Sequence, residues 1–167
     1  GFPDCGATPY GVANTNDCSI EFCPDMIPSE DTLQRFGDSL SMPPLYFGNP
    51  DYYHRLKAFG FWSLPSRRSE SLRWLEEQLD KAVDFYEKEV ENRHWYGLYD
   101  YGDIMHTYDP YRHIWRYDIG GYAWQNTELM PTMWLWLAFL RTGRSDILTL
   151  AEAMTRHASD VDTYHMG

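Results

Sequence analysis

The fold is decided by a run near the end of the chain, Pro131-Thr-Met-Trp-Leu-Trp-Leu-Ala-Phe-Leu-Arg-Thr-Gly-Arg-Ser-Asp146. Its apolar residues occupy every face of a helix, and a helix that is apolar all round is buried on all sides. We therefore predict a buried helix over residues 126–141, in which Pro131 is tolerated because it falls in the first turn. Gly143 is placed to end this helix in a left-handed conformation.

A second, amphipathic helix is predicted to follow directly. Ser145 is placed to cap it, and apolar residues recur at three- and four-residue steps as far as about Ser159. Because the link between the two helices is so short, we expect them to form an antiparallel hairpin.

A third helix is predicted upstream, beginning after the N-cap residue Ser69. Its charged residues fall on one face and its apolar residues on the other, where we expect them to point inward: Leu72, Leu75, Leu79, Ala82, Val83, Tyr86 and Val90. One amphipathic helix on each side cannot enclose a helix that is apolar all round. We therefore expect the rest of the same polypeptide to complete the helical domain.

The first 65 residues are irregular and carry eight of the ten prolines. Loose alternation predicts a strand near residues 19–22. Ser29 or Asp31 could cap a short helix that Gly37 would end.

Composition narrows the possible partners. The chain has 167 residues and a formal net charge of −11, so nucleic acid is not expected as a partner. The longest apolar run has eight residues, too few to cross a membrane. No basic segment precedes an apolar one, so no signal peptide is expected in this sequence. The three cysteines lack metal-ligand spacing, and neither a metal nor a cofactor is expected.

Aromatic residues gather in the connection between the helix predicted after Ser69 and the buried helix predicted over residues 126–141. Residues 94–124 hold ten of the 28 Phe, Trp and Tyr residues and three of the six His. A connection this long inside a compact domain is usually functional.

This connection also carries a resemblance to a known family. The runs Tyr101-Gly-Asp-Ile-Met-His-Thr-Tyr-Asp109, Arg112-His-Ile-Trp-Arg-Tyr-Asp118 and Gly120-Gly-Tyr-Ala-Trp-Gln-Asn-Thr-Glu128 resemble the α/α-toroid domain of the exo-rhamnogalacturonan lyases. The resemblance covers residues 58–167 and implies a mainly α fold, a partial α/α toroid of helical hairpins. It also implies that residues 1–57 are the tail of an adjoining β-sandwich plus a linker, and that the protein is extracellular or periplasmic.

The resemblance further implies β-elimination at galacturonic acid in a pectic polysaccharide or oligosaccharide. The C5 proton of the uronate is acidic only when its carboxylate is neutralised, so the site needs a cation or amide, a base and an acid. Candidate catalytic residues are His106, Tyr108, Arg112, His113, Tyr117 and Asn126. Candidate substrate-binding residues are Trp115, Arg116, Trp124, Glu128 and His165. Residues 104–117 have a formal charge of +1, a small cationic island in an acidic chain.

Other interpretations of the same residues stay open. Arg112 and Arg116 could simply pair with Asp109 and Asp118. His94 and His157 could be structural residues at helix ends, and His165 could be a loop anchor or, with Asp162, half of a metal site. A glycoside hydrolase on the same ring would instead use carboxylates such as Asp103, Asp118 and Glu128. The chain could also be a non-catalytic sugar-binding or structural fragment.

Overall fold

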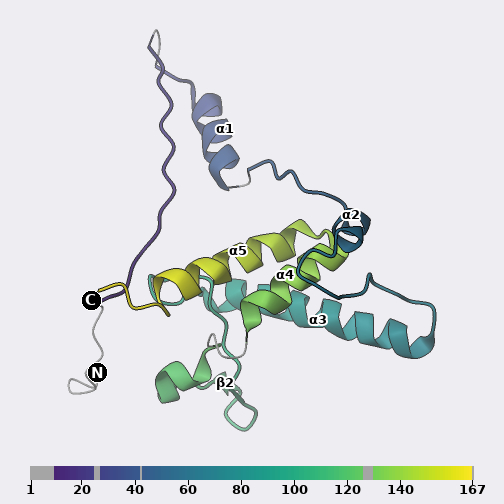
Figure 1. Ribbon diagram of the computed structural model, residues 1–167. Helices are drawn as coiled ribbons and strands as arrows, with labels where there is room; N and C mark the ends of the chain where they lie inside the picture. Colours follow the sequence, from purple (N-terminus) through teal and green to yellow (C-terminus); the bar gives the residue numbers. More distant parts are fainter. Residues whose placement is uncertain (1–9, 25–26, 42, 126–129, 167) are drawn as a thin grey trace.

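The computed structural model describes residues 10–24, 27–41, 43–125 and 130–166, and only the backbone of residues 121–122. The protein is mainly helical, as predicted. Its elements are α1 (Glu30–Ser41), α2 (Pro50–Arg55), α3 (Glu70–Arg93), β1 (Tyr108–Asp109), β2 (Ile114–Trp115), the 3-10 helix η1 (Tyr117–Ala123), α4 (Pro131–Thr142) and α5 (Ser145–Asp160). Figure 1 shows α3, α4 and α5 forming one helical body, from which the hairpin of β1 and β2 projects. Within the described ranges, no helix is both long and apolar enough to span a bilayer.

The predicted hairpin of two helices is present as α4 and α5. Gly143 ends α4 with a φ of +68°, and its N–H donates to the carbonyl of Phe139, as expected of a C-terminal glycine. The core between the two helices consists of Leu135, Phe139 and Leu140 of α4 and of Ile147, Ala151 and Met154 of α5.

Two details of this prediction were wrong. Met130 has a left-handed conformation, so α4 begins at Pro131, and residues 126–129 lie outside the described ranges. Ser145 is the first residue of α5 rather than its cap, and the N-cap residue Arg144 makes no side-chain cap bond. As expected when one helix on each side cannot enclose it, α4 is not buried on all faces: Met133 is 41% exposed, and Trp134 and Trp136 are only half-buried. The described elements cover only part of the circumference of this helix.

The third predicted helix is α3, and Ser69 caps it as expected. The hydroxyl of Ser69 accepts a hydrogen bond from the Leu72 N–H at 3.2 Å. At the other end, His94 adopts a left-handed conformation and its N–H donates to Val90. The predicted inward face is buried fully only at Val83, whereas Leu75 is 50% exposed. The first half of α3 therefore lies beyond the core that α4 and α5 provide.

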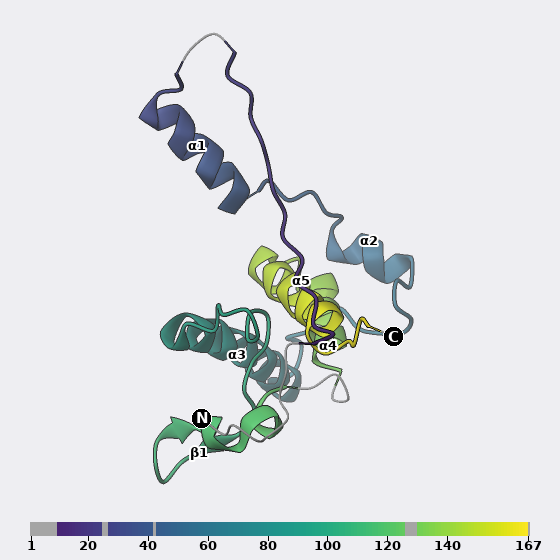
Figure 2. The same cartoon turned by 90° about the vertical axis from the view of Figure 1, so that its left-hand side faces the viewer.

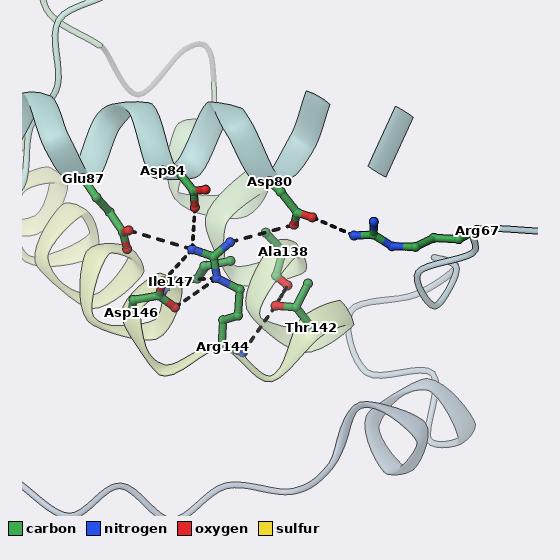
Figure 3. Close-up of polar contacts among 9 residues, drawn as sticks. All are labelled: Arg67, Asp80, Asp84, Glu87, Ala138, Thr142, Arg144, Asp146 and Ile147. Carbon is green, nitrogen blue, oxygen red and sulfur yellow. Dashed lines mark hydrogen bonds and ion pairs between the residues drawn. The ribbon is translucent and has the colours of Figure 1, made fainter. Parts of the chain in front are cut away.

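Two arginines attach the hairpin to α3. Arg141 donates to Glu76 at 2.6 Å, and both side chains are largely buried. Arg144 lies among four carboxylates, which Figure 3 shows converging on its guanidinium: Asp80, Asp84, Glu87 and Asp146. Hydrogen bonds from Arg144 hold the pKa of Asp146 below its usual value. These contacts fix the position of α3 relative to the α4–α5 hairpin.

The N-terminal segment differs from its prediction. Ser29 does cap α1, because its hydroxyl accepts the Thr32 N–H, but the helix continues through Gly37 to Ser41. No residue of α1 is buried, and Figure 2 shows this helix apart from the helical body. The described part of residues 10–57 contains no strand, and residues 19–22 are exposed extended chain. That residues 1–57 belong to a β-sandwich and its linker stays a prediction.

Candidate functional site

The connection between α3 and α4 is built on a short backbone ladder. Met105 pairs with Trp124, the His106 N–H donates to the Ala123 carbonyl, and the Gln125 N–H donates to the Ile104 carbonyl. Further along, Tyr108 pairs with Trp115 in the β1–β2 hairpin. Residues that the sequence places up to 21 positions apart therefore lie side by side.

Four of the predicted site residues join one aromatic cluster around Trp95, which is buried. Trp95 packs edge-on against Trp115 and Trp124, with ring centroids 5.8 and 5.4 Å apart, and its indole N–H donates to the Tyr117 hydroxyl at 2.9 Å. Tyr108 also packs edge-on against Trp115, with ring centroids 5.3 Å apart. Trp115 is itself only 4% exposed, and its indole N–H donates to Glu89, so in this structure its ring packs against other side chains rather than facing solvent.

The two candidate arginines are already paired in the structure. Arg112 contacts Asp109 at 2.8 Å and Asp118 at 3.2 Å, and Arg116 contacts Asp118 at 2.9 Å. Hydrogen bonds from Arg116 and Arg112 lower the pKa of Asp118 to about 2. The two positive charges of Arg112 and Arg116 are matched by the two negative charges of Asp109 and Asp118, so a substrate carboxylate would meet no net formal positive charge here.

The remaining candidates are spread out. His106 is exposed and lies 2.9 Å from the Thr107 hydroxyl, while His113 has a φ of +55° in the turn of the β1–β2 hairpin. His165 contacts the Ser159 carbonyl at 2.7 Å and anchors the last residues of the chain to α5. Asn126 and Glu128 lie outside the described residues. The roles given to all of these residues stay predictions.

A second cluster was not predicted as the main site. Asp103 and His157 are both buried, and Asp103 Oδ2 lies 3.4 Å from His157 Nε2. The carboxylate of Asp162 approaches the same nitrogen at 3.5 Å. The other ring nitrogen of His157, Nδ1, is buried and has no hydrogen-bond partner among the described residues.

This cluster lines an open hollow of about 470 Å³. Among the described residues, Trp124 is the one predicted site residue on its wall, and the other lining residues are Gly97, Leu98, Tyr99, Asp100, Asp103, His157, Val161 and Asp162. Within the described ranges, no group of three or more His, Cys, Asp or Glu residues is arranged to hold a metal ion. The hollow therefore offers an aromatic surface, carboxyl groups and one imidazole.

Burial makes Asp103 an unusual carboxyl group. Loss of solvation, with a smaller contribution from the nearby charge of Asp162, raises its pKa to about 7, although the Ile104 N–H, which donates to Asp103 Oδ1 at 2.8 Å, acts in the opposite direction. A carboxyl with this pKa exchanges a proton near neutrality and can act as an acid or a base.

Comparison with known proteins agrees with this architecture. Residues 43–167, about three quarters of the chain, match the family described as "PcRGLX-like protein C-terminal alpha/alpha toroid domain". The chain belongs to this family. The toroid match begins fifteen residues before the boundary at residue 58 that the sequence predicts.

A curated relative of this PcRGLX-like chain is the "Uncharacterized protein YetA" of Bacillus subtilis (strain 168). The two are 53% identical over 167 residues, which is all of this chain and 19% of the relative. The chain thus spans about a fifth of that relative's length, as expected of one part of a larger polypeptide.

The sequence did not predict the cluster of Asp103, His157 and Asp162 as the catalytic site of this toroid domain. His157 was expected to be structural, and Asp103 was considered only for hydrolysis. The signal that could have found the cluster is the position of His157 on the inward face of α5, three residues after the buried Met154. A histidine on an apolar face needs a polar partner, and here the partner is 54 residues upstream.

We expect Asp103→Asn to flatten the pH dependence of stability of this PcRGLX-like domain. The pKa of Asp103 is about 7 in the folded protein and 3.8 in the unfolded reference. The folded state therefore retains a proton that the unfolded state releases, so stability is greatest below the lower value and falls as the pH rises towards 7. The full effect is about 4 kcal/mol. Asn cannot ionise, yet it can still accept the Ile104 N–H.

Melting temperatures of the full-length protein at about pH 5 and pH 8 test this expectation. The wild type should lose more stability than Asp103→Asn between these values, whereas Glu152→Gln, an exposed acid on α5, should behave like the wild type. An equal pH dependence in the wild type and Asp103→Asn would contradict it.

Proposed function

We propose that the chain is part of a polysaccharide lyase that acts on a pectic backbone containing galacturonic acid. The observation that carries the proposal is the pair of Asp103 and His157 in a hollow beside Trp124, within a domain of the PcRGLX-like family. Two titratable groups in contact, one with a pKa near 7, supply the proton transfers that elimination requires. The indole of Trp124 offers a surface on which the apolar face of a sugar ring can stack.

The bonds and protons of the proposed elimination balance. A base removes the proton from C5 of the uronate, a double bond forms between C4 and C5, and the C4–O bond breaks. The departing oxygen then takes a proton from an acid. In this proposal the candidate residues on the connection between α3 and α4, such as His106 and Tyr108, act on the uronate. An extracellular or periplasmic location is part of the same proposal, because such polymers lie outside the cell.

Ultraviolet absorbance tests the proposal, because elimination creates an unsaturated uronate that absorbs and hydrolysis does not. The full-length protein is incubated with a pectic polymer in which uronate alternates with a neutral sugar. We expect absorbance to rise, and to rise more slowly by about 10²-fold or more when His106→Ala or Tyr108→Phe removes a proton-transfer group. New reducing ends without absorbance would instead indicate a glycoside hydrolase, and binding without turnover would indicate a sugar-binding module.

A further inference from the structure

We propose that the hollow between residues 97–103 and the end of α5 holds the neutral sugar that departs in the elimination, and that Asp103 delivers the proton to its oxygen. This inference rests on the proposed function and deepens it, since it assigns one side of the scissile bond to a particular place in the structure.

The charge of the hollow argues for a neutral occupant. Three carboxyl groups line it, those of Asp100, Asp103 and Asp162, and the described lining includes no Lys or Arg. A uronate would bring a further negative charge next to these groups without a cation to balance it. Carboxylates are, in contrast, good acceptors for the hydroxyl groups of an uncharged sugar.

The shape and polarity of the wall argue for a sugar rather than for a cation. Trp124 is half-buried on the wall and makes edge contacts with the rings of both Trp95 and Tyr117, so its position is fixed before any ligand arrives. A fixed aromatic ring beside hydrogen-bond acceptors suits a ring that has one apolar face and polar edges.

The Nδ1 atom of His157, unpaired among the described residues, is a second, independent indication that the hollow binds a ligand. Its side chain is 5% exposed and lines the hollow, and Nδ1 has no partner among the described residues. A buried polar atom without a partner costs free energy unless a ligand or water satisfies it. A sugar hydroxyl in the hollow can become that partner if binding turns the imidazole ring so that Nδ1 meets the ligand.

The geometry also supplies a route for the proton. The acid form of Asp103 holds a proton that it can give to the departing oxygen, which leaves Asp103 as a carboxylate. His157 Nε2 lies 3.4 Å from Asp103 Oδ2 and can return a proton from solvent to it after each turnover. The proton taken from C5 goes to a different group on the uronate side, so protons balance without any further reactant.

A change of leaving group tests the role of Asp103 in the full-length protein. One substrate carries a neutral sugar on O4 of the uronate, and the other is a 4-deoxy-4-fluoro uronide. Fluoride departs without a proton, so Asp103→Asn should lower kcat by about 10²–10⁴-fold on the first substrate and by less than about tenfold on the second. Glu152→Gln is the matched control and should leave both rates unchanged. An equal loss on both substrates, or no loss on either, would overturn the proposed role.

Binding tests the occupant separately from turnover. The neutral monosaccharides D-galactose and L-rhamnose and the acidic D-galacturonate are titrated against the wild type, Asp103→Asn and Trp124→Ala, with circular dichroism to show that each variant is folded. We expect the neutral sugars to bind the wild type and to bind Trp124→Ala at least about tenfold more weakly. Galacturonate binding that depends on Trp124 would overturn the assignment of a neutral occupant.

The two proposals fail in different ways. If no unsaturated product forms, both the proposed elimination and proton delivery by Asp103 are wrong. The binding experiment still shows whether the hollow holds a neutral sugar. Elimination that is equally fast on a polymer of galacturonate alone overturns the neutral occupant and leaves the lyase intact.

Discussion

Gly102→Ala is expected to destabilise the helical domain by about 3 to 5 kcal/mol. Gly102 has a φ of +82°, and a Cβ at this position would overlap the carbonyl oxygen of Ala153 on α5. The overlap is with backbone rather than with the end of a flexible side chain, so either α5 or the loop must move. Because this approach sets Asp103 against His157, the same substitution should also disturb the hollow.

Gly60→Ala is the matched control for the loss of a glycine with positive φ. Gly60 has a φ of +89°, but nothing lies within 4 Å of the position of its Cβ. This variant should cost only the backbone strain, about 1 kcal/mol. Native-state hydrogen exchange of amides in α5 of the full-length protein reports the stability of this domain alone. Equal losses in the two variants would show that the loop does not rest on α5 as described.

The helical hairpin could be predicted because its signals are local. A continuous apolar run, a glycine after it and a second amphipathic pattern specify α4 and α5 without reference to the rest of the chain. The N-terminal segment could not be predicted in the same way. Gly37 is a poor helix residue by about 1 kcal/mol, yet α1 continues through it, because a single glycine is a weak signal against the neighbouring residues.

The site shows the limits of sequence patterns more clearly. The formal charge of +1 applies to residues 104–117 alone. In the structure Asp118, just outside this range, contacts both arginines and offsets that charge. The pairing of Arg112 and Arg116 with acidic neighbours was one of the interpretations left open, and the geometry agrees with it. Whether either arginine also binds a substrate carboxylate stays a prediction.

The contact between Asp103 and His157 depends on tertiary structure alone. It exists because Gly102 lets the loop lie on α5, and no spacing in the sequence encodes that approach. The buried aromatic cluster is similar: Trp95 and Tyr117 meet because a backbone ladder, rather than a helix, connects them.

The ion pair of Arg141 and Glu76 carries the second large expected effect. Their side chains are 14% and 11% exposed, and Arg141 also donates to the Ser63 carbonyl at 2.7 Å. Among the described residues, Arg141→Met would leave the buried Glu76 carboxylate with only the Ser66 N–H as a partner. We expect a loss of about 3 to 5 kcal/mol, because a single buried charge is left uncompensated.

Two further variants separate this effect from the loss of an ordinary ion pair. Arg35→Met removes the exposed pair with Asp31 and should cost no more than about 0.5 kcal/mol. Glu76→Leu combined with Arg141→Met should cost less than Arg141→Met alone, since the double variant buries no unpaired charge. Hydrogen exchange of amides in α4 measures the losses in the Arg141 variants, and exchange of amides in α1 measures the loss in Arg35→Met. If Arg141→Met cost as little as Arg35→Met, water would have to reach Glu76, and the attachment of α3 to the hairpin would then rest on Arg144 and its four carboxylates instead.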